Sequence, residues 1–281
     1  MDRQEEQRAG IERFIDKMPT LSTTTGKVLE ICSRADASPN ELNRVVSLDP
    51  ILTGQVLKLI NSAYYSLANK VTSLTRAITM LGMNTVKNMA LSTAVIRAVA
   101  GAKKSQALPA AKFWQHSLSV GVAAKLLGAM REMAAGEREE LFVAGLLHDL
   151  GKVPFGDEYS AALRVARDEQ RPLIEVENEI LGMNHQEIGG LIALKWRLNE
   201  VISSTIGHHH DEEMPSAKVA LVALADLFVN IHEIGSAGND FPREEEMTRL
   251  LAALSMEQRQ LGALTDQLLA EIHRAEVFLE L

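Results

Sequence analysis

The sequence has a single cysteine, Cys32, and only 4% of its 281 residues are aromatic. One thiol cannot form an intrachain disulfide, and it cannot supply a thiolate metal cluster. With so few aromatic side chains, leucine, alanine, isoleucine, valine and methionine must fill the core. No run of about 18 or more apolar residues occurs, and the start MDRQEEQRAGIERF lacks the apolar stretch of a signal peptide. We therefore expect a cytoplasmic protein with no membrane partner.

Positive charge is also scarce, because the formal net charge at pH 7 is −8. An acidic chain repels the phosphate backbone of nucleic acids. Residues 38–61 do resemble a helix–turn–helix, with two capped helices and a short turn between them. The second of these helices offers only Lys58 as a cation, whereas a recognition helix needs side chains that contact bases and phosphates. We therefore do not expect a nucleic-acid partner.

Strand-like alternation with glycine-rich hairpin signals is missing as well, and helix start signals are frequent. Ser38 precedes Pro39, and Glu41 follows three residues after Ser38. This spacing is typical of a capping box with proline at the first helical position. The sequence therefore predicts an all-α fold.

The helices divide into two expected lobes, because one stretch of small and polar residues, AGAKKSQALP at 100–109, has the composition of a linker. About five helices are expected before residue 100. Further helices are expected near residues 110–129, 137–150, 173–182, 185–197, 200–210 and 216–231, with two more at the C-terminal end. The predicted division is 1–100 for the first lobe, 110–235 for the second, and 236–281 for C-terminal helices that pack on the core.

The segment ELFVAGLLHDLGKVPFG, residues 140–156, places His148 and Asp149 at the end of an apolar run. The run is apolar on all sides, which indicates a buried helix. Gly151 suits the position just after a helix, and Pro154 prevents its continuation. The unpaired carbonyls of a last helical turn favour a cation. A metal site is one interpretation of the pair, and a satisfied histidine at a helix end is the other.

Asp226 lies within KVALVALADLFVNI, where helical spacing leaves no solvent-facing side around it. A buried carboxylate is costly unless it pairs with a cation, accepts hydrogen bonds or binds a metal. The segment itself offers only Lys218 as a cation, two turns earlier. Any other partner must come from another part of the chain.

Histidines gather in the same part of the sequence. His116 lies on an apolar-faced helix, His185 opens a helix, and His208, His209 and His210 close another. Each alone is more often structural. Together with two buried carboxylates they form the nitrogen and oxygen donor set of a transition-metal site. This number of donors suits two ions bridged by a carboxylate better than one tetrahedral zinc.

These residues resemble known families. His116, the His148–Asp149 pair and Asp226 are similar to the H…HD…D pattern of the HD superfamily of metal-dependent phosphohydrolases, which are all-helical. His185 and the His209–His210 pair resemble the additional histidines of its two-metal branch, which includes the HD-GYP phosphodiesterases. The Gly-Tyr-Pro loop of that branch is absent, because the sequence reads DEEMPSAK after the histidines.

Residues 15–235 resemble an HDOD domain, the HD-related output domain of bacterial signalling proteins. The marks of this resemblance are Asp49–Pro50, Asn61–Ala63 and Leu81–Gly82. It implies that the second lobe is an HD-like helical bundle. Many HDOD domains have lost metal ligands, whereas this sequence keeps every position that can be matched.

The resemblance also implies roles for the residues. Asp149 would bridge two divalent transition-metal ions, iron being favoured over manganese and zinc. One ion would be held by His116, His148 and Asp226, and the other by His185 and His209, with His210 as a further ligand or a substrate contact. Lys152 would act with Asp149 in catalysis by holding a phosphate oxygen, although a helix-end cation that complements the helix dipole is the alternative.

Two functions follow from these roles, and the sequence does not decide between them. The first is a bacterial signal-transduction protein that keeps its metal site and acts through a protein partner or a nucleotide ligand. The second is an active phosphohydrolase or phosphodiesterase that acts on a nucleotide or phosphodiester.

Overall fold

A computed structural model describes residues 3–18, 21–34, 36–100, 108–155, 159–239, 241 and 244–280 of the chain. Within these ranges the regular structure is entirely helical. The predicted all-α fold is therefore confirmed. No helix in the same ranges combines the length and the apolar character needed to cross a membrane.

The first hundred residues contain six described helices, one more than the sequence indicated. They are α1 (Arg3–Lys17), α2 (Thr23–Ser33), α3 (Pro39–Val46), α4 (Pro50–Ile60), α5 (Leu74–Leu81) and α6 (Met83–Ala100). The predicted cap at Ser38 is present, because its hydroxyl accepts the backbone N–H of Glu41 at 3.2 Å. Asp49 caps α4 in the same way through the N–H groups of Ile51 and Leu52.

The rest of the chain follows the expected order with two differences. Its elements are α7 (Ala110–Met130), α8 (Ala135–Leu147), η1 (Leu150–Lys152), α9 (Tyr159–Glu169), α10 (Leu173–Leu181), α11 (His185–Lys195), α12 (Glu200–His208), α13 (Ala217–Ile231), α14 (Glu244–Ala253), α15 (Gln258–Ala275) and η2 (Glu276–Glu280). Helix α8 ends before His148 instead of running to residue 150. Helix α9 was not predicted, because two of its three buried positions are the small residues Ala162 and Ala166, which give a weak apolar signal.

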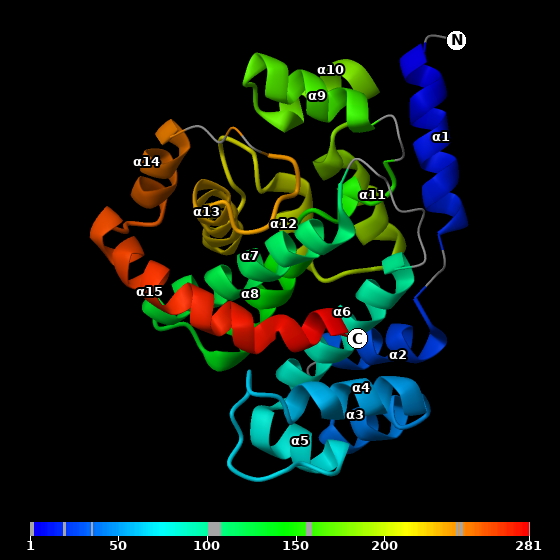
Figure 1. Cartoon of the computed structure of the whole chain (residues 1–281). Coiled ribbons are helices and arrows are strands. Elements are labelled where there is room, and N and C mark those ends of the chain that lie inside the picture. The colour runs from blue at the N-terminus through cyan, green and yellow to red at the C-terminus, as the bar shows by residue number, and fades with distance from the viewer. Residues whose placement is uncertain are drawn as a thin grey trace.

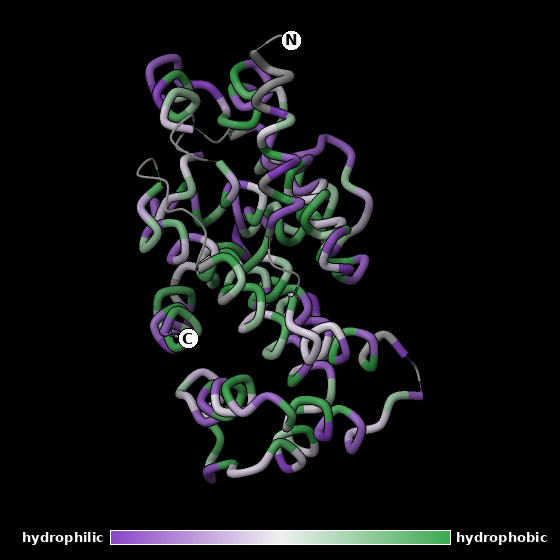
Figure 2. Tube along the Cα trace, turned by 90° about the vertical axis from the view of Figure 1, so that its right-hand side faces the viewer, coloured by the Kyte–Doolittle hydropathy of each residue, from purple (hydrophilic) through white to green (hydrophobic). Residues whose placement is uncertain are grey.

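The helices form an elongated arrangement around α7 and α8 (Figure 1). Helices α2–α5 lie at one end and α9 and α10 at the other, while α6 runs from the first group toward the centre. Figure 2 shows hydrophobic residues concentrated where the central helices pack and hydrophilic residues on the outer turns. The expected linker at 100–109 falls mostly on residues 101–107, which lie outside the described residues, so the lobe boundaries stay a prediction.

Helices α7 and α8 approach closely at a pair of glycines. A Cβ atom on Gly145 would lie 2.8 Å from the Cα of Gly121, and one on Gly121 would lie 2.6 Å from the carbonyl oxygen of Phe142. Real Cβ atoms essentially never come within 3.0 Å of such atoms. The absence of both side chains therefore lets the backbones meet, which brings His116 of α7 toward His148 at the end of α8.

Candidate metal centre

The predicted site residues come from five separate helices and meet in the interior. His116 lies in α7, His148 caps the end of α8, and Asp149 follows it. The others are His185 at the start of α11, His209 at the end of α12 and Asp226 in α13. None of the six is more than 4% exposed to solvent. Six donor side chains buried together do not act as independent helix-end residues.

The first group of ligand atoms consists of His116, His148 and Asp226, whose candidate atoms all lie within 4.8 Å of one another. The Nε2 atom of His116 is 3.0 Å from Oδ1 of Asp226, and Nε2 of His148 is 3.5 Å from the same oxygen. Asn230, one turn along α13, donates a hydrogen bond of 2.8 Å to that oxygen. Asp226 therefore presents its carboxylate to both histidines from a fixed position.

The second group lies on the other side of Asp149. The Nε2 atoms of His185 and His209 are 3.3 Å apart, and they lie 3.5 Å and 3.8 Å from Oδ1 of Asp149. His210 belongs to the same group, with candidate ligand atoms within 4.8 Å of those of His185 and His209. His208 does not take part, because it is exposed and its Nδ1 contacts the carboxylate of Asp211 at 2.7 Å.

Asp149 divides its two oxygens between the groups. Its Oδ1 faces His185 and His209, whereas its Oδ2 lies 3.2 Å from Nε2 of His148 and 3.8 Å from Nε2 of His116. One carboxylate oxygen toward each group is an arrangement that would let Asp149 bridge two ions.

Several donor atoms are buried without a hydrogen bond, which fits a metal site. Among the described residues, both ring nitrogens of His116, Nε2 of His148 and Oδ1 of Asp149 make no hydrogen bond. Such groups are costly in a protein interior. The opposite ring nitrogens of His148 and His209 contact the carbonyls of Gly145 at 2.7 Å and Thr205 at 2.9 Å, so their Nε2 atoms are aimed inward. Imidazole nitrogens held in this way are ordinary ligands of transition metals.

Charge in the centre is distributed unevenly. Burial lowers the pKa of His148, but the carboxylates of Asp149 and Asp226 outweigh burial and raise it to about 10. Burial raises the pKa of Asp149, yet His148 and Lys152 bring it well below its ordinary value. The carboxyl pKa of Asp226 is lowered similarly by His116 and His148 against the effect of burial. The carboxylates are therefore ionised, as ligands must be.

Lys152 is buried beside the centre, with 3% of its surface exposed. Its Nζ atom donates to Oδ2 of Asp149 at 2.8 Å and to the carbonyl of Ala237 at 3.1 Å. The other lysine considered from the sequence, Lys218, lies away from Asp226 and pairs with Glu137 and Glu140 at 3.1 Å and 3.0 Å. The alternative of a salt bridge between Lys218 and Asp226 is therefore wrong.

Sequence reasoning missed Glu177 and Tyr159, both fully buried. Glu177, in α10, accepts from Nδ1 of His185 at 2.6 Å and from the backbone N–H of His185 at 2.9 Å. Its other oxygen accepts the Tyr159 hydroxyl at 2.5 Å. Burial raises the pKa of Glu177, but His185 and its other partners outweigh burial and lower it. The available signal was its place on the apolar face of α10, one turn after Leu173 and beside Val176.

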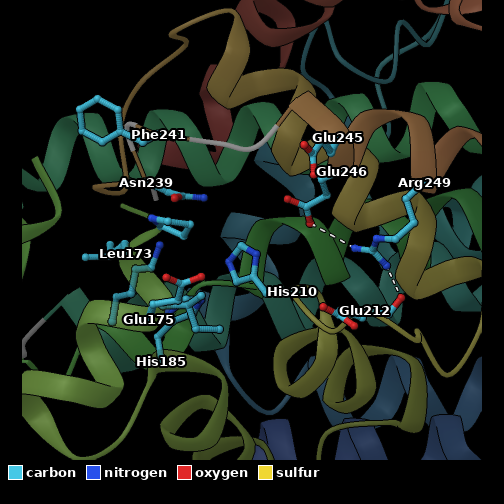
Figure 3. A pocket seen from close by; sticks show the side chains of 13 residues that line it. Leu173, Glu175, His185, His210, Glu212, Asn239, Phe241, Glu245, Glu246 and Arg249 are labelled. Atoms are coloured by element: carbon cyan, nitrogen blue, oxygen red, sulfur yellow. Dashed lines mark hydrogen bonds and ion pairs between the residues drawn. The ribbon is translucent and has the colours of Figure 1, made fainter. Parts of the chain in front are cut away.

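A cavity of about 340 Å³ adjoins the second group (Figure 3). The residues that line it are Lys152, Pro172, Leu173, Ile174, Glu175, His185, His210, Glu212, Asn239, Phe241, Glu245, Glu246 and Arg249. His210 and His185 point into it, and Lys152 borders it from the side of Asp149. A small molecule in this cavity would lie directly against the buried donors.

The family model of the HDOD domain matches residues 18–212, which is more than half of the chain. This chain belongs to the HDOD domain family. The HDOD resemblance inferred from Asp49–Pro50, Asn61–Ala63 and Leu81–Gly82 is thereby confirmed.

Several known proteins are similar to this HDOD protein. A crystal structure of an HDOD domain protein with unknown function from Geobacter sulfurreducens is 27% identical, with a TM-score of 0.76 and 97% of each chain covered. A Shewanella amazonensis structure, provisionally named a phosphohydrolase, is 23% identical with a TM-score of 0.71 over 96% of each chain, and shares the fold.

A third is Ribonuclease Y of Mycoplasma mycoides, 27% identical over 208 residues, which are 67% of this chain and 42% of that protein. The chain spans about half the length of the curated relatives it matches.

Proposed function

We propose that this HDOD protein is a phosphohydrolase whose centre holds two divalent transition-metal ions. The observation that carries the proposal is the position of Asp149, whose Oδ2 faces His148 and whose Oδ1 faces His185. His116, His148 and Asp226 would hold one ion, and His185 and His209 the other, with Asp149 shared. Ions bound there would supply Lewis acidity toward phosphoryl oxygens and would activate water at neutral pH.

The protein's own residues would bind and orient the phosphate. Lys152 lines the cavity with its ammonium group fixed by Asp149 and the Ala237 carbonyl, so its charge is available to a phosphate oxygen without loss of side-chain freedom. His210 lines the same cavity, and burial lowers its pKa well below the ordinary value, with the neighbouring His209 and His185 adding to the effect. A neutral imidazole there can donate one hydrogen bond and accept another from the substrate.

Iron remains the favoured ion, with manganese and zinc as alternatives, because the donor set mixes imidazole with carboxylate. The names of two similar proteins, a phosphohydrolase and a ribonuclease, agree with chemistry at a phosphate ester. A signal-transduction role, with a protein partner or a nucleotide as its ligand, stays a prediction. A signal-transduction role is compatible with hydrolysis. The signal would then be the binding of a partner and not the product of the reaction.

The test pairs elemental analysis with hydrolysis of bis-p-nitrophenyl phosphate, with and without added Mn²⁺. Wild-type protein is expected to carry about two ions per chain and to turn over the ester. Asp149→Ala is expected to lose both the metal and the activity, whereas Asp36→Ala, at an exposed carboxylate paired with Arg34, should lose neither. Equal metal content in wild type and Asp149→Ala would refute the centre. Metal without turnover of any phosphate ester would refute the hydrolase and leave the signalling role.

A further inference from the structure

The cavity beside His185 and His210 is closed on one side by apolar walls. Leu173 and Ile174 come from the start of α10, and Phe241 comes from the segment that precedes α14. Figure 3 places Phe241 and Leu173 on the same side of the cavity, with Asn239 between them. A volume of about 340 Å³ lies at the small end of the range for ligand sites. The ring of Phe241 beside the amide of Asn239 suits a ligand with one planar ring, not a ligand with a chain of several rings.

Four of the other residues that line the cavity are glutamates. Glu212, Glu245 and Glu246 lie on the side of the cavity near Arg249, whereas Glu175 lies beside Leu173 and His185 (Figure 3). The nearby cation, Arg249, is directed at the protein itself.

Arg249 donates to the carbonyls of Asp211 and Glu212 and lies 3.5 Å from the carboxylate of Glu246. Figure 3 shows the guanidinium of Arg249 between Glu212 and Glu246 and away from His210. Three glutamates against one engaged arginine give this side of the cavity a negative potential, and negative potential repels a polyanion.

We propose that the cavity selects a small phosphate ester with one uncharged, ring-bearing group, and that it excludes oligonucleotides. This inference rests on the proposed hydrolase function. The reacting phosphate would lie against Lys152 and the buried donors, and the ring would lie against Phe241 and Leu173. Each further phosphate of an RNA or DNA strand would have to pass the glutamates, which costs affinity in proportion to the number of phosphates. The substrate class would therefore differ from that named for Ribonuclease Y.

The experiment compares two probes on the Mn²⁺-loaded full chain. The small probe is p-nitrophenyl phosphate, which carries a single uncharged ring, and the large probe is a ten-nucleotide RNA. Both kcat/KM and equilibrium binding are measured. Glu212→Lys combined with Glu245→Lys reverses two exposed charges at the cavity. Asp168→Lys, at an exposed residue that does not line the cavity, is the matched control.

Wild-type protein should bind and hydrolyse the small ester in preference to the RNA. The double variant should gain on the order of tenfold in RNA binding, and added salt should remove the gain. The small ester and the Asp168→Lys control should change little. RNA bound or cleaved as well as the small ester by wild type would overturn the inference, as would a double variant without any gain. Preferential binding of the small ester without turnover would support the cavity's selectivity while refuting the hydrolase.

Discussion

Replacing Glu177 by glutamine removes the negative charge that contacts His185 and keeps a side chain of nearly the same size at that position. Glu177 touches His185 through two hydrogen bonds, at 2.6 Å to Nδ1 and 2.9 Å to the backbone N–H. The carboxylate holds the Nδ1 atom as the protonated one, so that Nε2 faces Asp149 and His209 with its lone pair. A carboxylate in this position also raises the basicity of a histidine ligand.

The expected loss is confined to the second ion. Changing such an outer carboxylate lowers metal affinity by about 10- to 100-fold, which corresponds to about 1.4–2.8 kcal/mol of binding free energy. The glutamine oxygen can still accept from His185, while the Tyr159 hydroxyl loses its carboxylate partner, at a cost of about 1 kcal/mol in folding stability. Glu177→Ala would leave all three donors without a partner, at about 1–3 kcal/mol each, so it is the less informative variant.

The assay is calorimetric titration of metal-free protein with Mn²⁺, together with urea unfolding of the same samples. The first ion, at His116, His148 and Asp226, should bind Glu177→Gln as it binds wild type. Nitrogen-15 spectra of the metal-free variant should also show a weaker hydrogen bond at Nδ1–H of His185, a change that a purely structural role for Glu177 would not produce.

Glu139→Gln is the matched control, because Glu139 is a buried carboxylate that bonds Lys125 at 2.5 Å and the Tyr65 hydroxyl at 3.2 Å, away from the centre. It should lose stability without losing the second ion. Wild-type affinity for both ions in Glu177→Gln would refute the reasoning. Equal weakening in Glu139→Gln would show a general effect of destabilisation instead.

The remaining predictions concern pH and packing. The pKa of His148 is about 10 in the metal-free protein, so binding of a metal at pH 7 should release about one proton from His148, and metal affinity should rise with pH. Calorimetric titrations in buffers of different ionisation enthalpy measure the number of protons released. A titration without proton release would contradict this prediction. The raised pKa of His148 also stabilises the metal-free fold. This stabilisation is present in full below about pH 6.5, the pKa of the histidine in the unfolded chain, and unfolding experiments should show it lost as the pH rises toward 10. Gly145→Ala should cost about 1–3 kcal/mol in urea unfolding, because its Cβ would meet Gly121 at 2.8 Å. Gly190→Ala, with open space around its Cβ, should be neutral or gain about 0.5–1 kcal/mol, and a similar loss at both sites would refute the packing argument.

Local signals in the sequence determined most of the helices and the identity of the donors. Caps such as Ser38 and Asp49 act over three residues, so a single stretch of sequence contains all the information they need. Asp226 was predictable as a buried carboxylate because its own helix surrounds it with apolar residues. The expected ligands do meet, whereas their role in holding metal stays a prediction.

Only the tertiary structure decided which donors face each oxygen of Asp149 and which residues contact the donors from outside the centre. The crossing of α7 and α8 at Gly121 and Gly145 sets the distance from His116 to His148, and no local pattern encodes a crossing between two helices. The split of Asp149's oxygens, the contact of Glu177 with His185 and the acidic lining of the cavity likewise join segments far apart in the chain. Such contacts depend on how the apolar faces of separate helices pack, and that is settled only when the whole core forms.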